Sequence, residues 1–231
     1  MTENEIFRIV IDTYLKMGHA GLLRMSALGE EVFFGHIAAA DSGNYPHYYN
    51  GPMGFRGIHP AQPCLGSDTV WAKGSILTID NGFSFQAYAT DKTQAYWAGP
   101  ESSLPDQARS AYAICVEAQE RAAEDLRPGA IPSEIWRKTK EFVAKTPYSA
   151  GFMGLGENQT QFLGHGIGLT IDEQPVIAKG FDQPLEAGTV IALEPKIGLP
   201  GFGMLGIENT YEITDKQAVC LTGKNNGIIF R

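Results

Sequence analysis

The chain has 231 residues, 43% of them hydrophobic, and its 18 basic and 26 acidic residues give a net charge of −8. This length and hydrophobic fraction can supply one sizeable core, in one domain or in one domain built from two similar halves. An acidic balance without a basic run argues against nucleic acid or an anionic membrane surface as the main partner.

The sequence shows no segment of the kind that crosses a membrane or directs export. No stretch approaches the ~20 apolar residues of a membrane helix, and residues 1–18 lack the basic start and apolar run of a signal peptide. Cys64, Cys115 and Cys220 form no CxxC pair and no even framework, which favours reduced thiols over disulfides. We therefore expect a cytoplasmic protein.

The N-terminal part of the chain begins with a helix and continues in strands. Between residues 3 and 17, apolar side chains recur at steps of three and four, which is typical of an amphipathic helix. Residues 27–68 are rich in Gly, Pro and aromatic residues and predict short strands and long surface loops. Residues 76–80 and 86–93 predict the two strands of a hairpin, with a turn region that starts at Asn81 and Gly82.

The middle of the chain is helical, and the C-terminal third returns to strands. Residues 106–126 predict the clearest helix, which Pro128 and Gly129 terminate, and Ser133 can cap the next one. Residues 147–158 predict a loop. Two further strands are expected over residues 189–194 and 206–214, joined by a wide turn. Helices between two strand-rich regions favour an α+β arrangement.

Asp80 and Asp91 lie eleven residues apart in the first predicted hairpin. If they are directly opposite, both side chains leave the same face with their Cβ atoms roughly 5 Å apart. Two carboxylates at that distance repel each other and are costly to bury, and a cation between them removes the cost. The alternative is a solvated hairpin with two surface acids, although Asp80 ends the apolar run 76–79.

Glu194 and Glu208 repeat this pattern, because each follows apolar residues in a predicted strand. A charged residue in such a strand needs a partner. No nearby Arg or Lys is an obvious one, and Lys196 is expected to reach Glu194 only with a contorted side chain. His165 lies between Gly164 and Gly166. It is interpreted either as a metal ligand or as a residue in a glycine-containing turn. Four carboxylates and one imidazole form a mixed O/N set that suits Mn, Co, Fe or Zn.

At this point the sequence resembles the pita-bread metallopeptidases of the creatinase/aminopeptidase fold. This family includes methionine aminopeptidases, Xaa-Pro aminopeptidases and prolidases. Its pattern is an Asp, a second Asp eleven residues later, a His between glycines, a Glu before Pro, and a Glu before a polar residue and Thr. The matching positions here are Asp80, Asp91, His165, Glu194 and Glu208.

The resemblance implies a pseudo-twofold α+β fold with a curved, mainly antiparallel sheet flanked by helices. It implies two divalent metal ions (Mn, Co, Zn or Fe) and cleavage of the N-terminal residue from a peptide, with Glu194 handling the proton of the attacking water. Residues 1–231 would form a single catalytic domain that lacks the usual N-terminal domain of Xaa-Pro peptidases, as a natural short form or a trimmed chain. A homodimer is possible within this family.

The substrate-facing positions depart from the family pattern. Asp172 stands where the family carries a second His after the ligand His, and Cys64 stands where it carries a His before the first Asp, with His59 as a displaced candidate. Gln94 replaces the Arg that usually follows the second Asp. We expect Cys64, Asp172 and His59 to contact substrate. Three interpretations stay open: a divergent peptidase, a hydrolase of another amide or cyclic substrate, and a metal-binding module with weak activity.

Overall fold

A computed structural model describes residues 1–27, 30–47, 51–59, 66–223 and 225–231 of the chain. The α-helices are α1 (Glu3–Lys16), α2 (Asp106–Asp125) and α3 (Pro132–Val143), and short 3-10 helices cover Ala40–Asn44, Glu101–Ser103, Ser149–Gly151 and Gly156–Asn158. The strands are β1 (Leu23–Arg24), β2 (Glu31–Val32), β3 (Gly35–Ala39), β4 (Ile76–Phe85), β5 (Tyr88–Trp97), β6 (Phe162–Gly166), β7 (Glu173–Ala178), β8 (Val190–Leu193), β9 (Lys196–Leu199), β10 (Gly203–Gly206), β11 (Asn209–Ile213), β12 (Ala218–Cys220) and β13 (Ile229–Phe230).

Two main sheets form the centre of the molecule. One has the strand order β13-β5-β4-β3 and the other β12-β11-β8-β6-β7, while β9 pairs with β10 and β1 with β2. All these pairs are antiparallel except β13 with β5. The predicted mixed, mainly antiparallel α+β fold is confirmed.

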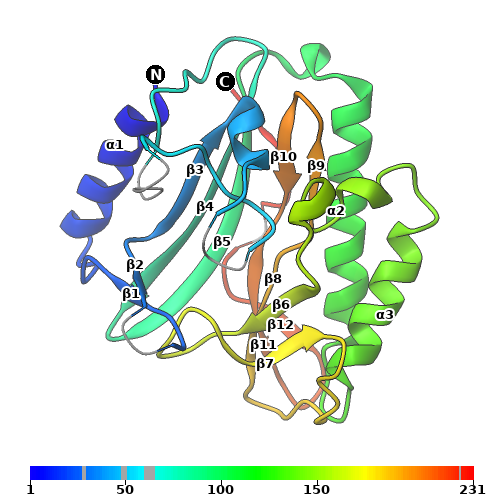
Figure 1. Cartoon of the computed structure of the whole chain (residues 1–231). Helices are drawn as coiled ribbons and strands as arrows, with labels where there is room; N and C mark the ends of the chain where they lie inside the picture. Colours follow the sequence, from blue (N-terminus) through cyan, green and yellow to red (C-terminus); the bar gives the residue numbers. More distant parts are fainter. Residues whose placement is uncertain (28–29, 48–50, 60–65, 224) are drawn as a thin grey trace.

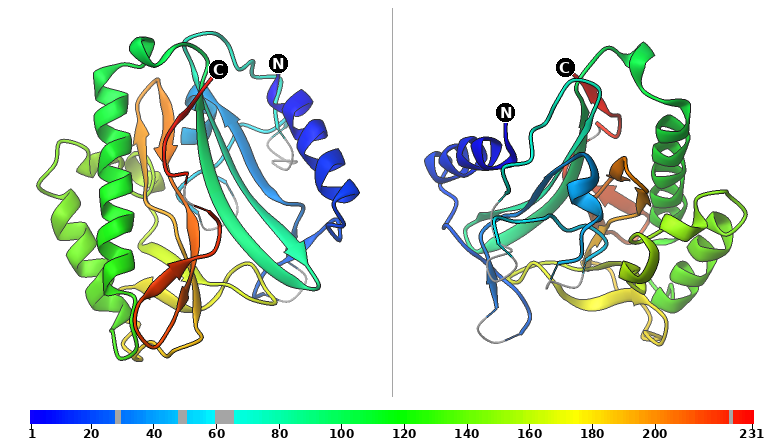
Figure 2. Two further views of the ribbon diagram at one scale, coloured as in Figure 1. Left: turned by 180° about the vertical axis from the view of Figure 1, so that it is seen from behind. Right: turned by 45° about the horizontal axis from the view of Figure 1, so that its top comes forward.

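Helices cover the outside of the sheets on both sides (Figure 1). Helix α1 packs on β3, where Ile6 and Phe7 join Phe34 and Ile37 in a small core. Helices α2 and α3 lie on the opposite side, α2 against β8, β9 and β10 and α3 against β7. Figure 2 shows the same layering from behind and from above, with both termini at one end of the molecule. No helix in the described part of the chain is long and apolar enough to cross a membrane.

The two long helices occur where the sequence predicts them. A capping box of Thr2 and Glu5 starts α1. The face of α2 that was expected to be apolar is buried against the main core, through Ala108, Ala111, Tyr112, Cys115, Ala118 and Ala122, with Leu126 just beyond the helix. The expected cap of α3 is wrong: Ile131 is the N-cap residue, and the Ser133 hydroxyl donates to the Asp182 carboxylate instead.

The first hairpin is longer than its sequence pattern indicates. Asn81 and Gly82 do not begin a turn but lie inside β4, where Asn81 is paired with Gly35 of β3 and Gly82 with Asp91 of β5. Pairing on both sides keeps these two turn-forming residues extended. The chain reverses at Gln86 and Ala87, whose φ values of 51° and 71° give the left-handed backbone of a tight hairpin turn.

The C-terminal hairpin is divided between two sheets. Its outer ends form β8 and β11 in the five-stranded sheet, and its tip forms the separate pair β9 and β10. Glu194 and Pro195 on one strand, and Ile207 and Glu208 on the other, lie at the junction. The hairpin therefore breaks its regular ladder where the two glutamates occur.

Candidate metal centre

Strands β4 and β5 supply the two aspartates. Asp80 pairs with Thr93 and Asp91 with Gly82, so the two aspartates are not directly opposite each other as the sequence allowed. They are two positions apart along the ladder, and side chains two residues apart point to the same face. The conclusion that both carboxylates share one face is unchanged.

Strand β6 supplies His165. The glycines that flank this residue let the backbone of β6 lie close to its two neighbouring strands, β7 and β8. A Cβ atom on Gly164 would lie 2.1 Å from the Ala192 carbonyl oxygen, and one on Gly166 would lie 2.4 Å from that of Gln174. Neither approach is possible for a larger residue. These glycines therefore hold His165 deep in the sheet, and the alternative of a turn residue is wrong.

Glu194 and Glu208 join the two halves of the fold. The Glu194 amide donates to the Leu163 carbonyl of the chain just before His165, at 2.9 Å. The Thr93 amide donates to the Glu208 carbonyl at 3.3 Å, which links β5 to the C-terminal hairpin. Residues far apart in the sequence thus converge on one point through backbone hydrogen bonds.

The open side of the cluster surrounds the Nε2 atom of His165. This nitrogen lies 4.0 Å from Asp91 Oδ2, 3.8 Å from Glu194 Oε1 and 3.9 Å from Glu208 Oε1. Two ligands of one ion are separated by at most about twice the ~2.0–2.2 Å metal–ligand bond. Each oxygen is therefore at a distance from Nε2 that two ligands of one cation could have, and for Asp91, His165 and Glu208 the ligand atoms all lie within 4.8 Å of one another.

Two further observations fit a cation there. The His165 Nδ1 atom lies 3.0 Å from the Gly166 carbonyl oxygen, which can only accept a hydrogen bond. The neutral ring therefore carries its proton on Nδ1 and presents the lone pair of Nε2 to the cluster. Glu208 is 1% exposed, and its Oε1 atom has no hydrogen-bond partner among the described residues. A buried carboxylate oxygen without a donor is costly, and a metal ion would satisfy it.

The other side of the cluster contains a lysine. The Lys196 Nζ atom is 2.7 Å from Glu194 Oε2, 2.9 Å from Glu208 Oε2 and 3.2 Å from Asp80 Oδ2. The expectation that Lys196 would need a contorted side chain to reach Glu194 is wrong. Residues two apart in an extended chain point to the same face, so this alternation is the signal that would have placed Lys196 beside Glu194.

The charges of the cluster are unevenly balanced. Burial raises the pKa of Asp91 to about 8, and the negative charge of Asp80 raises it further. Burial and the charge of Asp91 likewise raise the pKa of Glu208 well above its usual range. Burial acts most strongly on Asp80 and would raise its pKa, but Lys196, His36 and the hydrogen bonds of that carboxyl together outweigh burial and lower its pKa. Four carboxylates face one ammonium group, and the Asp91 side carries the uncompensated negative charge.

The cluster forms the floor of a pocket, which apolar side chains from other elements surround. Its walls include Met25, Val32, Phe34, Met53 and Ile171. Asp172, a predicted substrate contact, also lines the pocket and lies 4.0 Å from His165 Nδ1 through its Oδ1 atom. The walls can thus hold an apolar group beside one carboxylate.

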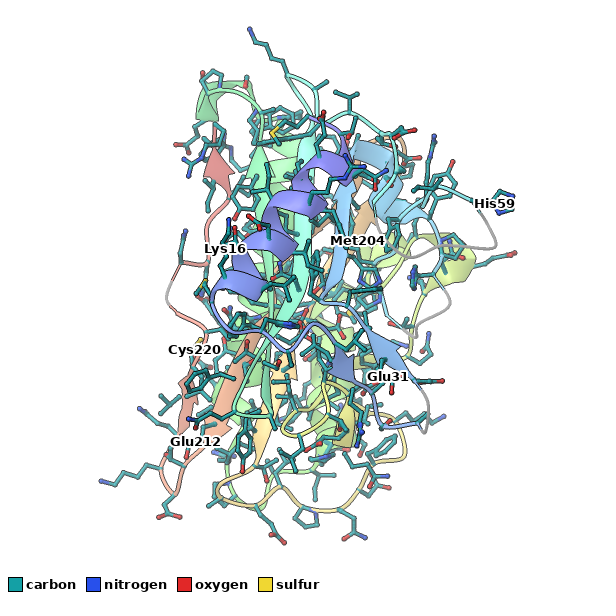
Figure 3. The ribbon with its side chains drawn as sticks, turned by 90° about the vertical axis from the view of Figure 1, so that its left-hand side faces the viewer. Lys16, Glu31, His59, Met204, Glu212 and Cys220 are labelled. Atoms are coloured by element: carbon teal, nitrogen blue, oxygen red, sulfur yellow. The ribbon has the colours of Figure 1, made fainter. Side chains whose placement is uncertain are left out.

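The other two predicted substrate contacts are His59 and Cys64. His59 is exposed, is not among the residues that line the pocket, and projects from the side of the molecule in Figure 3. Cys64 lies outside the described residues. Gln94 donates to the Gly227 carbonyl at 2.7 Å instead of facing the pocket.

His36 is a pocket residue that the sequence analysis did not find. It lies on β3 directly opposite Asp80, and no motif around it indicates this position. Burial and the neighbouring His47 lower its pKa to about 3, so the ring is neutral at neutral pH. Only the pairing of β3 with β4 brings it to the site.

Comparisons with known proteins identify the family of the chain. The sequence profile of metallopeptidase family M24 matches residues 1–215. The chain belongs to this family. An Xaa-Pro dipeptidase of Pyrococcus furiosus is 34% identical over 158 residues, which cover 68% of this chain and 42% of that protein. A probable dipeptidase, PepE, of Mycobacterium tuberculosis is 33% identical over 165 residues, which cover 71% and 41%. The matched part of this M24 chain therefore covers less than half the length of each of these two relatives.

Solved structures show the same M24 fold. An X-Pro aminopeptidase from Thermotoga maritima superimposes with a TM-score of 0.80 at 26% identity, covering 100% of this chain and 56% of the other. A methionine aminopeptidase from Rickettsia prowazekii gives a TM-score of 0.66 at 15% identity, covering 96% and 86%. The second likeness concerns the fold alone. The predicted pita-bread architecture is confirmed.

Proposed function

We propose that this chain is a metal-dependent peptidase that hydrolyses the bond after the N-terminal residue of a peptide, with a preference for Xaa-Pro sequences. The single observation that carries this proposal is the buried Oε1 atom of Glu208, which faces Asp91 and His165 without a hydrogen-bond donor. The names of the dipeptidase and aminopeptidase relatives support the choice of substrate.

The residues that would hold a divalent ion are Asp91, His165, Glu194 and Glu208. Their oxygen and imidazole atoms suit Mn, Co, Fe or Zn. A bound ion supplies a water molecule of lowered pKa and polarises the scissile carbonyl. The buried position of all four side chains keeps bulk water from competing for the site.

Side chains of the protein would carry out proton transfer and substrate binding. Glu194 has one oxygen on the open side of the cluster and the other on Lys196, which makes it the group placed to accept the proton of the attacking water and pass it to the leaving nitrogen. Asp172 lies at the pocket wall and is partly exposed, so it can bind the ammonium group of the peptide's N-terminus. The apolar walls would receive the side chain of that residue.

A substrate screen of the Mn- or Co-loaded chain tests the proposal. Xaa-Pro dipeptides, longer Xaa-Pro peptides and cyclic amides are compared, because Asp172 stands where relatives carry a histidine. We expect metal-dependent release of the N-terminal residue from at least one Xaa-Pro peptide. Glu208→Gln should abolish it, whereas the exposed control Glu186→Gln should not.

The alternatives correspond to separate outcomes of this screen. Turnover of cyclic amides alone would identify a hydrolase of a different substrate on the same fold. Metal binding without turnover of any substrate would contradict an enzyme and favour a metal-binding module.

A further inference from the structure

The carboxylate cluster contains two places where three ligand atoms come together. Asp91, His165 and Glu208 form one group, and Asp80, Glu194 and Glu208 form the other. Glu208 belongs to both groups. Two adjacent cation positions that share a glutamate are therefore built into the described part of the chain.

The second position already holds a cation from the protein. Lys196 Nζ contacts all three members of the group formed by Asp80, Glu194 and Glu208, at 3.2, 2.7 and 2.9 Å. The contacts to Glu194 and Glu208 are hydrogen bonds donated by the ammonium group, and the contact to Asp80 is an ion pair. These charge-assisted contacts surround the ammonium group with three carboxylates.

The fold directs the lysine to this position. Lys196 is the first residue of β9, pairs with Gly206 of β10 and is fully buried. A Cβ atom on Gly206 would lie 2.4 Å from Lys196 Cγ, so the missing side chain makes room for the aliphatic stem. With no exposed surface, the lysine has no open path to solvent, and the stem passes over Gly206 into the cluster.

The two glutamates separate the lysine from the open position. Their Oε2 atoms face Lys196, while their Oε1 atoms lie 3.8 and 3.9 Å from His165 Nε2. A divalent ion in the position of the ammonium group would have to displace the lysine. An ion beside the ammonium group would meet the repulsion of a like charge in a buried, weakly screened site.

We propose that the Lys196 ammonium group replaces one of the two metal ions expected for this family, and that the chain binds a single divalent ion through Asp91, His165, Glu194 and Glu208. This inference rests on the metal site of the proposed function and revises the two-ion expectation. Lys196 then neutralises Asp80 and bridges Glu194 to Glu208, as a second ion would. The attacking water would be held by one ion only.

Metal stoichiometry of the full chain tests the inference without reference to activity. Mn²⁺ is titrated by calorimetry, bound metal is counted by elemental analysis, and the Mn²⁺ electron paramagnetic resonance spectrum is recorded. We expect one ion per chain and the six-line spectrum of an isolated ion. Two ions per chain, or the spectrum of a spin-coupled pair, would overturn the inference.

The two aspartates of the first hairpin provide a matched pair of variants. Asp91→Asn should weaken Mn²⁺ binding by at least about tenfold, whereas Asp80→Asn should leave one ion bound, since Asp80 faces the lysine. Equal losses in both variants would contradict a single site.

The variant Lys196→Ala tests the lysine itself, because it removes the ammonium group and its bulk. A folded variant should take up a second ion. A folded variant that still binds only one ion would also contradict the inference.

These outcomes distinguish the inference from the proposed function. Two bound ions with peptide turnover would refute only the lysine replacement. One bound ion without turnover of any substrate would refute only the proposed function. A chain that binds no metal under any loading condition would refute both.

Discussion

Glu3 and Glu208 are both glutamates with almost no exposed surface, but their surroundings differ. The Glu3 carboxylate accepts hydrogen bonds from the Ala39 amide at 2.8 Å, the Ser67 amide at 2.8 Å and the Ser67 hydroxyl at 2.7 Å. Glu208 accepts from Lys196 and Thr93 through Oε2 only, and Oε1 has no donor among the described residues. The protein alone satisfies Glu3, whereas it leaves Glu208 incomplete.

This difference separates a structural carboxylate from a proposed metal ligand. Glu3 anchors α1 to the end of β3 and to the segment around Ser67, and both its oxygens are used in doing so. Glu208 sits beside other acids, where a missing donor increases the electrostatic cost of burial. Burial alone therefore does not indicate a metal ligand, whereas burial with an unsatisfied oxygen among like charges is what we expect of one.

The largest effect should come from removing Glu208 as a proposed metal ligand. Glu208→Gln replaces an anionic oxygen by a neutral amide, so we expect metal affinity to fall and metal-dependent hydrolysis to drop by at least about 100-fold. Added Mn²⁺ should raise the melting temperature of the native chain and have little effect on this variant. Steady-state rates and thermal melts measure both. A variant with native rates and a native response to Mn²⁺ would refute the role of Glu208.

The corresponding change at Glu3 should affect stability and leave metal binding intact. Glu3→Gln places an amide NH₂ group against backbone or hydroxyl donors, and leaving a buried donor unsatisfied costs about 1–3 kcal/mol. Denaturant unfolding of the metal-free chain measures this loss, with the exposed Glu186→Gln change as control. Loss of bound Mn²⁺ in the Glu3 variant would show that the comparison between the two glutamates is wrong.

The pH dependence should have opposite signs with and without metal. In the metal-free chain Asp91 and Glu208 have raised pKa values, that of Asp91 about 8. Because an unfolded carboxyl group titrates near about pH 4, the folded state binds more protons between about pH 4 and pH 8, and its stability falls as the pH rises. His165, whose pKa the nearby carboxylates raise despite its burial, adds to the same slope.

With Mn²⁺ bound, acidification instead protonates the ligands, releases the ion and lowers stability. Thermal melts from mildly acidic to mildly alkaline pH, with chelator and with Mn²⁺, measure both slopes. The prediction fails if chelator leaves the melting temperature unchanged at every pH although it is shown to remove the metal from the protein.

The smallest effect is expected at Asp172, a carboxylate that is only partly buried. Asp172→His removes the carboxylate that we propose to bind the ammonium group of the peptide, so we expect a modest rise in KM for Xaa-Pro dipeptides with unchanged metal content. The KM of the native chain and of the variant is the measurement. A variant whose KM stays at the native value would show that Asp172 does not bind the substrate.

The sequence by itself determined the three helices and the ligand candidates. Periodic apolar faces define α1 and α2, since helices are specified by local spacing. Asp80, Asp91, His165, Glu194 and Glu208 each follow from a local motif whose order along the chain is characteristic of the family. Neither inference needs knowledge of which strands pair.

Strand pairing decided the features that the sequence could not fix. The ladder with β3 keeps Asn81 extended, moves the turn to Gln86 and Ala87, and brings His36 opposite Asp80. The approach of β9 to β10 passes the Lys196 stem over Gly206 and delivers a cation into the cluster. These contacts join residues that are distant in the sequence, and a local pattern carries no information about the distance between them.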